Sequence, residues 1–178
     1  MNIIIFGSQY GTAKQYAEEL GRRTNTEVRS YKEKTDIDGC DTIVYIGALY
    51  AGGVLGMKET FGRLTHLRGK RIIIATVGLA DPTDPQNIES IRRSMCSQLL
   101  PEVFATAHIY HLRGGIDYSR LGIKHKTMMR MLYRQVQKIP EEERTAEVRA
   151  MIETYDKKVN FVDFNSLDGI MSDLRQGI

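Results

Sequence analysis

Residues 1–20 read MNIIIFGSQYGTAKQYAEEL, and this stretch decides the fold. Residues 1–6 are apolar and β-branched without alternation, which is the pattern of a strand buried on both faces of a parallel sheet. Apolar residues then recur at helical spacing, at Ala13, Tyr16, Ala17 and Leu20. This spacing predicts an amphipathic helix with one buried face. Thr12 and Gln15 are spaced as in a capping box, so we expect Thr12 to cap the helix.

The loop between this strand and this helix has the composition of an anion site. It consists of small, hydroxyl and amide residues without charge: Ser8, Gln9, Tyr10, Gly11, Thr12 and Ala13. Free backbone N–H groups and the positive end of the helix dipole favour a phosphate here. The Walker motif and the G-x-G-x-x-G motif are both missing, because the loop has no lysine and its glycines are Gly7 and Gly11. A strand–helix turn that binds nothing is the alternative interpretation.

The composition is that of a globular protein of about one domain. The chain has 178 residues, of which 42% are hydrophobic and 26% charged, which is ordinary for such a protein. We therefore predict a single domain over residues 1–178. No apolar stretch approaches the roughly 18 residues that a membrane span needs, and no signal-peptide pattern is present. A cytoplasmic protein is expected.

Cysteine and histidine residues do not indicate a metal site. Cys40 and Cys96 are isolated in the sequence, and we interpret them as reduced thiols. His108 and His111 would face opposite sides of a strand, which does not suit a shared metal ion. We expect neither a metal nor a nucleic-acid partner.

Positive charge is concentrated in one segment. Residues 113–138 hold seven basic residues and one acidic residue, although the net charge of the whole chain is only +3. The remainder of the chain is therefore mildly acidic. Four members of this segment are candidate contacts for an anionic substrate or a membrane: Arg120, Lys124, Lys126 and Arg130.

Strand and helix patterns alternate along the first two thirds of the chain. After residues 1–6, further strands are predicted at 27–31, 42–47, 71–78 and 105–112. Helical patterns lie around residues 57–64, after Asp84-Pro85, and near the C-terminus after Asp163 or Asn165. The alternation predicts a doubly wound α/β fold with a five-stranded parallel sheet in the order 2-1-3-4-5.

About fifty residues separate the predicted fifth strand from the last helix. Residues 121–137 predict a basic helix with Met128, Met129, Leu132 and Val136 inside, and a second helical pattern begins at Pro140. We interpret residues 113–162 as a basic, helical insertion. The alternative interpretation is that part of this segment is only extra helical packing that covers the edge of the sheet.

Two further loops are expected beside the phosphate loop. Ligands of open α/β sheets bind outside the carboxyl ends of the strands, where the strand order reverses. The loop after the third strand is formed by Ala48, Leu49, Tyr50, Ala51, Gly52 and Gly53. Its small residues let the backbone approach a flat ring, on which Tyr50 can stack; a surface tyrosine over glycines is the alternative. The loop after the fourth strand contributes Val77, Gly78, Leu79 and Asp81.

The loop of residues 8–13 resembles the FMN-phosphate loop of flavodoxins, in which hydroxyls and backbone amides hold the dianion without a cationic side chain. It is very close to the version in diflavin reductases, where a threonine stands at the position of Tyr10. This difference puts one hydroxyl contact in question, because a phenol reaches further than a threonine.

The whole chain resembles the flavodoxin-like family that includes the FMN-dependent protoporphyrinogen IX dehydrogenases of bacteria. The resemblance is carried by residues 8–13, 45–53, 111–117 and 157–163, and it includes the segment that plain flavodoxins lack. It implies that the three loops bind FMN, and that FMN accepts hydride equivalents from a substrate and passes electrons to a quinone.

The resemblance leaves the substrate and the partners open. A porphyrinogen is the implied substrate, and its propionates or an anionic membrane surface would meet the basic residues of segment 120–138. A solvated basic face is the alternative for these residues. An electron-transfer flavodoxin that docks to a redox-partner protein is the alternative function, although such carriers are typically acidic and this chain has a pI near 8.8. A binding or scaffold module without FMN is a third possibility.

Overall fold

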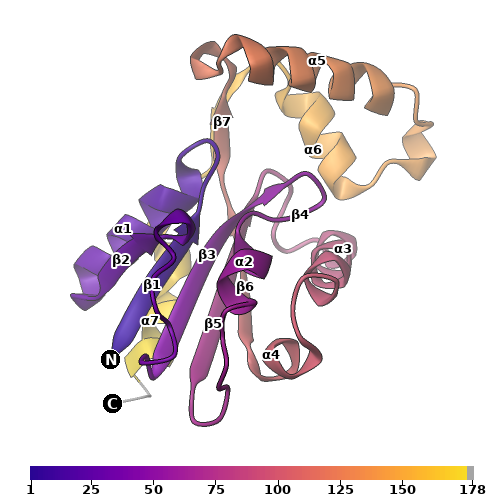
Figure 1. Ribbon diagram of the computed structural model, residues 1–178. Helices are drawn as coiled ribbons and strands as arrows, with labels where there is room; N and C mark the ends of the chain where they lie inside the picture. Colours follow the sequence, from indigo (N-terminus) through magenta and orange to yellow (C-terminus); the bar gives the residue numbers. More distant parts are fainter. Residues whose placement is uncertain (176–178) are drawn as a thin grey trace.

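The computed structural model describes residues 1–175, and its centre is a twisted parallel sheet (Figure 1). The strands lie in the order β2-β1-β3-β5-β6. Their bounds are Glu27–Ser30, Asn2–Gly7, Thr42–Tyr50, Arg71–Gly78 and His108–Arg113. Counted along the chain, these are the five predicted strands, and the predicted order 2-1-3-4-5 and fold class are confirmed.

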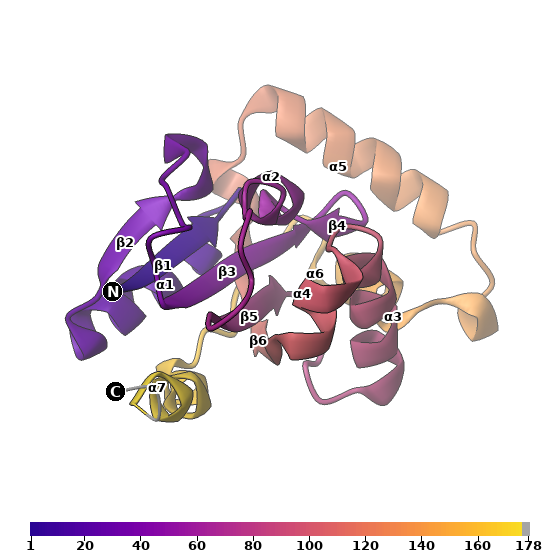
Figure 2. The same cartoon turned by 60° about the horizontal axis from the view of Figure 1, so that its bottom comes forward.

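Helices cover both faces of the sheet (Figure 2). One face is covered by α1 (Thr12–Thr24) and α7 (Asp168–Arg175), the other by α2 (Met57–Phe61), α3 (Pro85–Cys96) and α4 (Pro101–Thr106). Within β1, Ile4 packs towards α1, whereas Ile3 and Ile5 pack towards the opposite layer. The central strands are continuous apolar runs because both of their faces are buried.

The first helix begins differently from the prediction. Gly11 is the residue before α1 and has φ 96°, and no side chain of the described residues caps the helix. The predicted capping box of Thr12 and Gln15 is therefore wrong. Thr12 is already the first helical residue, and the backbone N–H of Gln15 donates to the carbonyl of Gly11 at 3.0 Å.

The third strand is longer than predicted and ends in a hairpin. β3 continues to Tyr50 and pairs antiparallel with β4 (Gly53–Val54). Ala51 and Gly52 form the turn, with φ 51° and 79°, and positive φ at both positions is typical of tight hairpin turns. Residues 48–50, predicted as a loop, are thus strand residues held by pairing.

The region before the last strand contains a helix that the sequence analysis missed. Residues 105–106 belong to α4 and not to the predicted strand, which begins only at His108. Pro101 stands in the first turn of α4, where its fixed φ suits a helix. Likewise, α2 ends at Phe61, so Leu64 lies beyond it.

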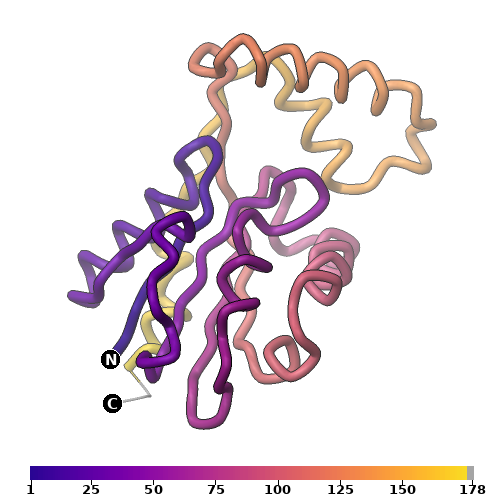
Figure 3. Tube along the Cα trace, viewed as in Figure 1, coloured from indigo at the N-terminus to yellow at the C-terminus, as the bar shows by residue number. Residues whose placement is uncertain are grey.

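The segment between β6 and α7 projects beyond the carboxyl ends of the strands (Figures 1 and 3). β7 (Gly115–Asp117) and β8 (Lys158–Asn160) pair antiparallel and form a stem. This stem carries α5 (Ile123–Val136) and α6 (Ala146–Thr154). The remaining short helices are η1 (Tyr31–Glu33), η2 (Tyr118–Arg120), η3 (Glu141–Glu143) and η4 (Phe164–Leu167). The predicted basic helix is α5, whereas the pattern from Pro140 becomes α-helical only after Thr145, which caps α6.

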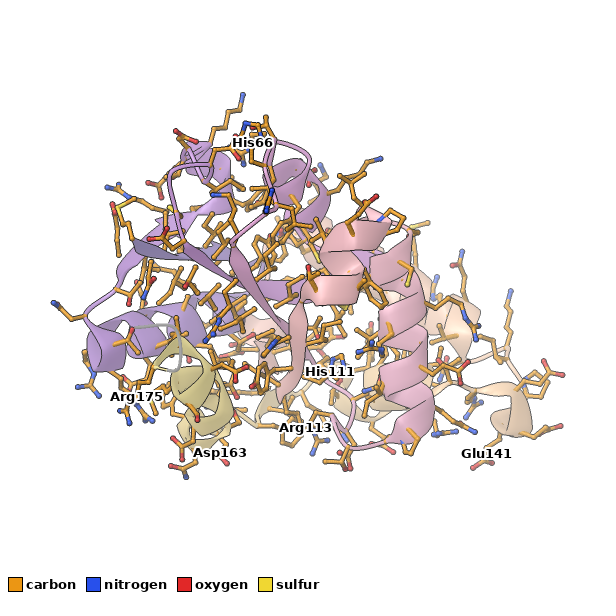
Figure 4. All side chains as sticks on the ribbon, turned by 90° about the horizontal axis from the view of Figure 1, so that it is seen from below. His66, His111, Arg113, Glu141, Asp163 and Arg175 are labelled. Carbon is orange, nitrogen blue, oxygen red and sulfur yellow. The ribbon has the colours of Figure 1, made fainter. Side chains whose placement is uncertain are left out.

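One buried tyrosine of α1 holds both ends of this segment. The hydroxyl of Tyr16 donates to the carbonyl of Arg113 at 2.8 Å and accepts from the backbone N–H of Asp163 at 3.0 Å. The guanidinium of Arg113 lies 3.9 Å from the centre of the Phe161 ring. Figure 4 labels Arg113 and Asp163, which lie near each other beside α7. The segment between β6 and α7 is therefore anchored to α1 near both of its ends.

Candidate functional site

A cavity of about 320 Å³ lies at the carboxyl ends of β1, β3 and β5. This volume is within the range of small-molecule sites. Nine of the sixteen residues predicted for the cofactor line it: Tyr10, Thr12, Ala48, Leu49, Tyr50, Ala51, Val77, Gly78 and Leu79. The three loops that were predicted separately are thus brought together around one space.

The loop before α1 leaves a helix N-terminus open. The Ser8 Oγ accepts a hydrogen bond from the backbone N–H of Gly11 at 3.1 Å, which shapes the loop. A side chain at Gly11 would meet no atom within 4 Å, so the space beside this residue is open. Ala13 is fully buried against the sheet. Uncapped N–H groups in the first turn of a thirteen-residue helix are suited to a phosphate.

Tyr10 occupies the part of the loop where the sequence departs from the pattern it resembles. Its ring makes edge contacts with Tyr50 at 6.4 Å and with His125 at 6.0 Å, measured between ring centres. Its hydroxyl is buried and has no hydrogen-bond partner among the described residues. Burial, with a smaller effect of Tyr50, raises the pKa of Tyr10. A buried hydroxyl without a partner is costly, and a polar ligand atom would satisfy it.

The hairpin of β3 and β4 forms one wall of the cavity. The hydroxyl of Tyr50 donates to the sulfur of Met128 in α5 at 3.9 Å. The Ser94 hydroxyl in α3 donates to the carbonyl of Gly52 at 2.6 Å. A Cβ atom at Gly53 would lie 2.6 Å from the side-chain amide of Gln98, so Gln98 would have to shift to admit a side chain there. Gly52 and Gly53 therefore shape the wall but do not line the cavity.

The loop after β5 forms the opposite wall, mainly with backbone atoms. The backbone N–H of Gly114 donates to the carbonyl of Gly78 at 2.7 Å, and Arg113 Nε donates to the carbonyl of Leu79 at 3.1 Å. The carboxylate of Asp81 accepts from Thr83 instead of facing the cavity, and these bonds lower its pKa. Asp81 thus closes a turn, while its carbonyl accepts from Asn87 Nδ2 at 2.8 Å.

The helices α5 and α6 cover the cavity, and none of their residues was among the predicted cofactor contacts. Met128, Met129 and Leu132 of α5, which were predicted to lie inside the basic helix, line it. Further lining residues were missed: Ala80, Asn87, Gly114, Gly115, Ile116, Glu147 and Met151. The pair Gly114-Gly115 was a visible signal, because small residues at a strand end allow close approach. Nothing in the local sequence of α6 indicated that Glu147 and Met151 face a ligand.

Gln9 joins the loop before α1 to the inserted helix. Its side-chain Nε2 lies 2.9 Å from Nε2 of His125 in α5, and since an amide nitrogen only donates, the imidazole accepts. Gln9 does not line the cavity. It therefore acts as a link between two walls.

The four basic residues that were predicted to contact a substrate or a membrane lie outside the cavity. Arg120, Lys124, Lys126 and Arg130 are exposed, and none lines the cavity. Ile123 and Met131 are exposed on the same helix, at 87% and 60%. The outer side of α5 is thus a cationic surface with two apolar side chains.

Neither a metal site nor a membrane-spanning helix is found among the described residues. Within residues 1–175, no group of histidine, cysteine and acidic side chains is arranged to hold a metal ion, and Figure 4 shows His66 and His111 in separate parts of the molecule. None of the helices in this part of the chain combines the length and apolar character that a membrane crossing requires.

Comparisons with known proteins identify a family and structural neighbours. A family model described as "Flavodoxin domain" matches residues 3–143, and members of that family typically bind FMN. Among solved structures, a cysteine-to-alanine mutant of flavodoxin from Pseudomonas aeruginosa is similar to the chain, with a TM-score of 0.40 and 15% identity, over 76% of this chain and 96% of that one. A comparison with curated protein sequences finds no match.

Proposed function

The chain belongs to the flavodoxin domain family, and from this premise we propose that it binds FMN and is an FMN-dependent oxidoreductase with a substrate of its own. The observation that carries the proposal is the cavity lined jointly by the three sheet-end loops and by α5 and α6. An electron carrier needs only an accessible flavin edge, whereas a covered cavity suits selection of a substrate.

The residues present fit FMN at both of its ends. The uncapped N-terminus of α1, beside the open space at Gly11, suits the phosphate. The buried Tyr10 hydroxyl, which lacks a partner among the described residues, is available to a polar atom of the same ligand. Tyr50, Ala48 and Gly78 line the cavity and are suited to contact a flat ring.

When bound, FMN supplies the group that accepts and passes on electrons. The chain's own residues would hold the group: the N-terminus of α1 would bind the phosphate, and Tyr50 and residues 77–80 would contact the ring and exclude water. Met128, Met129 and Met151 are polarizable and adaptable, and they would shape the covered side to the substrate.

For the substrate and the acceptor, we propose a porphyrinogen and a quinone, which the resemblance of residues 111–117 and 157–163 implies. The cavity is sized for one small ligand. A tetrapyrrole would therefore meet the flavin at the cavity mouth. The position of Arg120, Lys124 and Lys126 outside the cavity does not favour them as partners of its propionates.

We propose that the outer face of α5 contacts an anionic membrane surface, where a quinone would be available. Lys124, Lys126 and Arg130 are exposed, and no ion pair joins them to other described residues. Ile123 and Met131 would add apolar contact at the interface.

The first test of the function is the absorption spectrum and FMN titration of the purified chain. A flavin spectrum and saturable FMN binding are expected, and failure of both would overturn the flavin proposal. With protoporphyrinogen and a quinone, porphyrin fluorescence should appear faster than by autoxidation. Equal rates with and without protein, together with one-electron exchange with a redox-partner protein, would favour the carrier.

The membrane contact is tested on anionic vesicles at low salt. Changing Lys124, Lys126 and Arg130 together to Glu should abolish vesicle binding. A matched triple change of the exposed Lys34, Lys58 and Arg68 to Glu should retain it. Equal loss in both variants would indicate an effect of net charge and would contradict a specific role of α5.

A further inference from the structure

Glu147 is the one charged residue among the described residues that line the cavity. It lies in the first turn of α6, which contacts α3 and stands apart from α1 (Figure 1), whereas Thr12 is the first residue of α1. The match to the family model ends at residue 143. Glu147 therefore belongs to a part of the wall that the family model does not cover.

The carboxyl group of Glu147 has no hydrogen bond or ion pair with any described residue. The nearby cation, Arg149, is directed to Asp84, at 4.0 Å between Nη2 and Oδ2. The Asn87 amide donates to the carbonyl of Asp81. Glu147 is an exposed residue, yet the surrounding protein desolvates its carboxyl and raises the pKa of Glu147.

The packing around Glu147 is apolar. Ala80, Ala146 and Ala150 pack together beneath the start of α6 and offer no polar atom from their side chains. Met151 lines the cavity one turn further along the same helix. The carboxyl of Glu147 is therefore the one charged acceptor on this side of the cavity, where the neutral amide of Asn87 and apolar side chains form the rest of the wall.

We propose that the Glu147 carboxylate accepts a hydrogen bond from the ring N–H of FMN. In that case both α6 and the loops at the ends of the strands contribute to binding of the cofactor. With the phosphate at α1, the polar edge of the ring would lie towards α3 and α6. The oxidised flavin ring carries one N–H donor, at N3, and the one carboxylate among the described lining residues suits one such donor. This inference rests on the proposed function.

The experiment compares three ligands with apoprotein: FMN, riboflavin and FMN methylated at N3. Fluorescence titration is performed on the natural chain, Glu147→Gln, Glu147→Leu and the control Glu153→Gln. Glu153 lies in the same helix, is exposed and does not line the cavity. Circular dichroism and urea unfolding establish that each variant is folded.

Glu147→Leu should weaken FMN binding by about tenfold, the usual effect of losing a hydrogen bond to a charged group. Glu147→Gln, which keeps an acceptor oxygen, should lose less, and Glu153→Gln should bind as the natural chain does. The natural chain should discriminate against N3-methyl FMN, and Glu147→Leu should lose that discrimination. The midpoint potential of bound FMN should rise when the negative charge is removed.

Failure of the proposed function can be distinguished from failure of the proposed role of Glu147. If the natural chain binds neither FMN nor riboflavin, the proposed function fails as a whole. If it binds FMN but Glu147→Leu binds it equally well, or still rejects N3-methyl FMN to the same extent, the role of Glu147 is overturned while the FMN site remains. An unchanged midpoint potential in both Glu147 variants would also contradict it.

Discussion

The two sides of the cavity wall are held in place by different means. The sheet-end loops (residues 8–13, 48–53 and 77–81) follow strands whose side chains are almost completely buried. The insertion (residues 113–162) stands on a two-stranded stem and has a small core around Ile116, Tyr118 and Met129. Because less apolar surface is buried there, we expect the insertion to open at a lower free energy than the sheet. The cofactor site would thus be preformed, and its cover adjustable.

The largest expected difference is between core substitutions in the two regions. Ile73 in β5 is fully buried, and Ile73→Ala should lower the free energy of unfolding by about 2–5 kcal/mol. Met129→Ala in α5 should lower it by less, but should weaken ligand binding because Met129 lines the cavity. Urea unfolding and FMN titration measure both. Equal losses of stability would show that the insertion and the sheet form one cooperative unit.

A smaller effect is expected where the first loop leaves the sheet. A Cβ atom at Gly7 would lie 1.9 Å from the carbonyl oxygen of Leu55, so the backbone must move to admit it. Gly7→Ala should therefore cost about 3 kcal/mol and displace the start of the phosphate loop, which FMN titration would detect. Gly39→Ala is the control, because a Cβ there meets nothing within 4 Å. Normal stability of Gly7→Ala would contradict the close packing of this strand end.

The next smaller loss of stability is expected at Tyr16, which anchors residues 113–162 to α1. Tyr16→Phe removes the bonds to the carbonyl of Arg113 and the N–H of Asp163, and we expect a loss of about 2 kcal/mol. Hydrogen exchange should increase in residues 114–160 more than in β1 or β3. Tyr31→Phe serves as the control, since no hydrogen bond of its hydroxyl to a described residue is found. Uniform exchange across the chain would mean that Tyr16 supports the sheet generally and does not anchor the insertion.

The same comparison explains which features were predictable from the sequence. The strand order and the three loops follow from apolar runs and from the rule that ligands bind at the carboxyl ends of strands. The hairpin of Tyr50 and Gly53 and the helix at Pro101 were missed, because short elements depend on tertiary pairing more than on local pattern.

The contribution of α6 to the cavity was not predictable for a different physical reason. The direction of α6 is set by the pairing of β7 with β8, whose partners are more than forty residues apart in the sequence. No periodicity within Ala146–Thr154 records which side of the helix meets the cavity. The sequence therefore indicates an insertion but not the residues that it presents to a ligand.

The smallest expected effect concerns the direct link between the two regions. Gln9 and His125 share a hydrogen bond of 2.9 Å, and the His125 ring also contacts Tyr10. A double-mutant cycle with Gln9→Ala and His125→Ala should give a coupling energy of about 1 kcal/mol in FMN binding. Because Gln9 does not line the cavity, this coupling would measure how strongly the insertion holds the phosphate loop. A coupling energy of zero would mean that the two walls bind their ligand independently, and that closure of the insertion does not depend on the loop before α1.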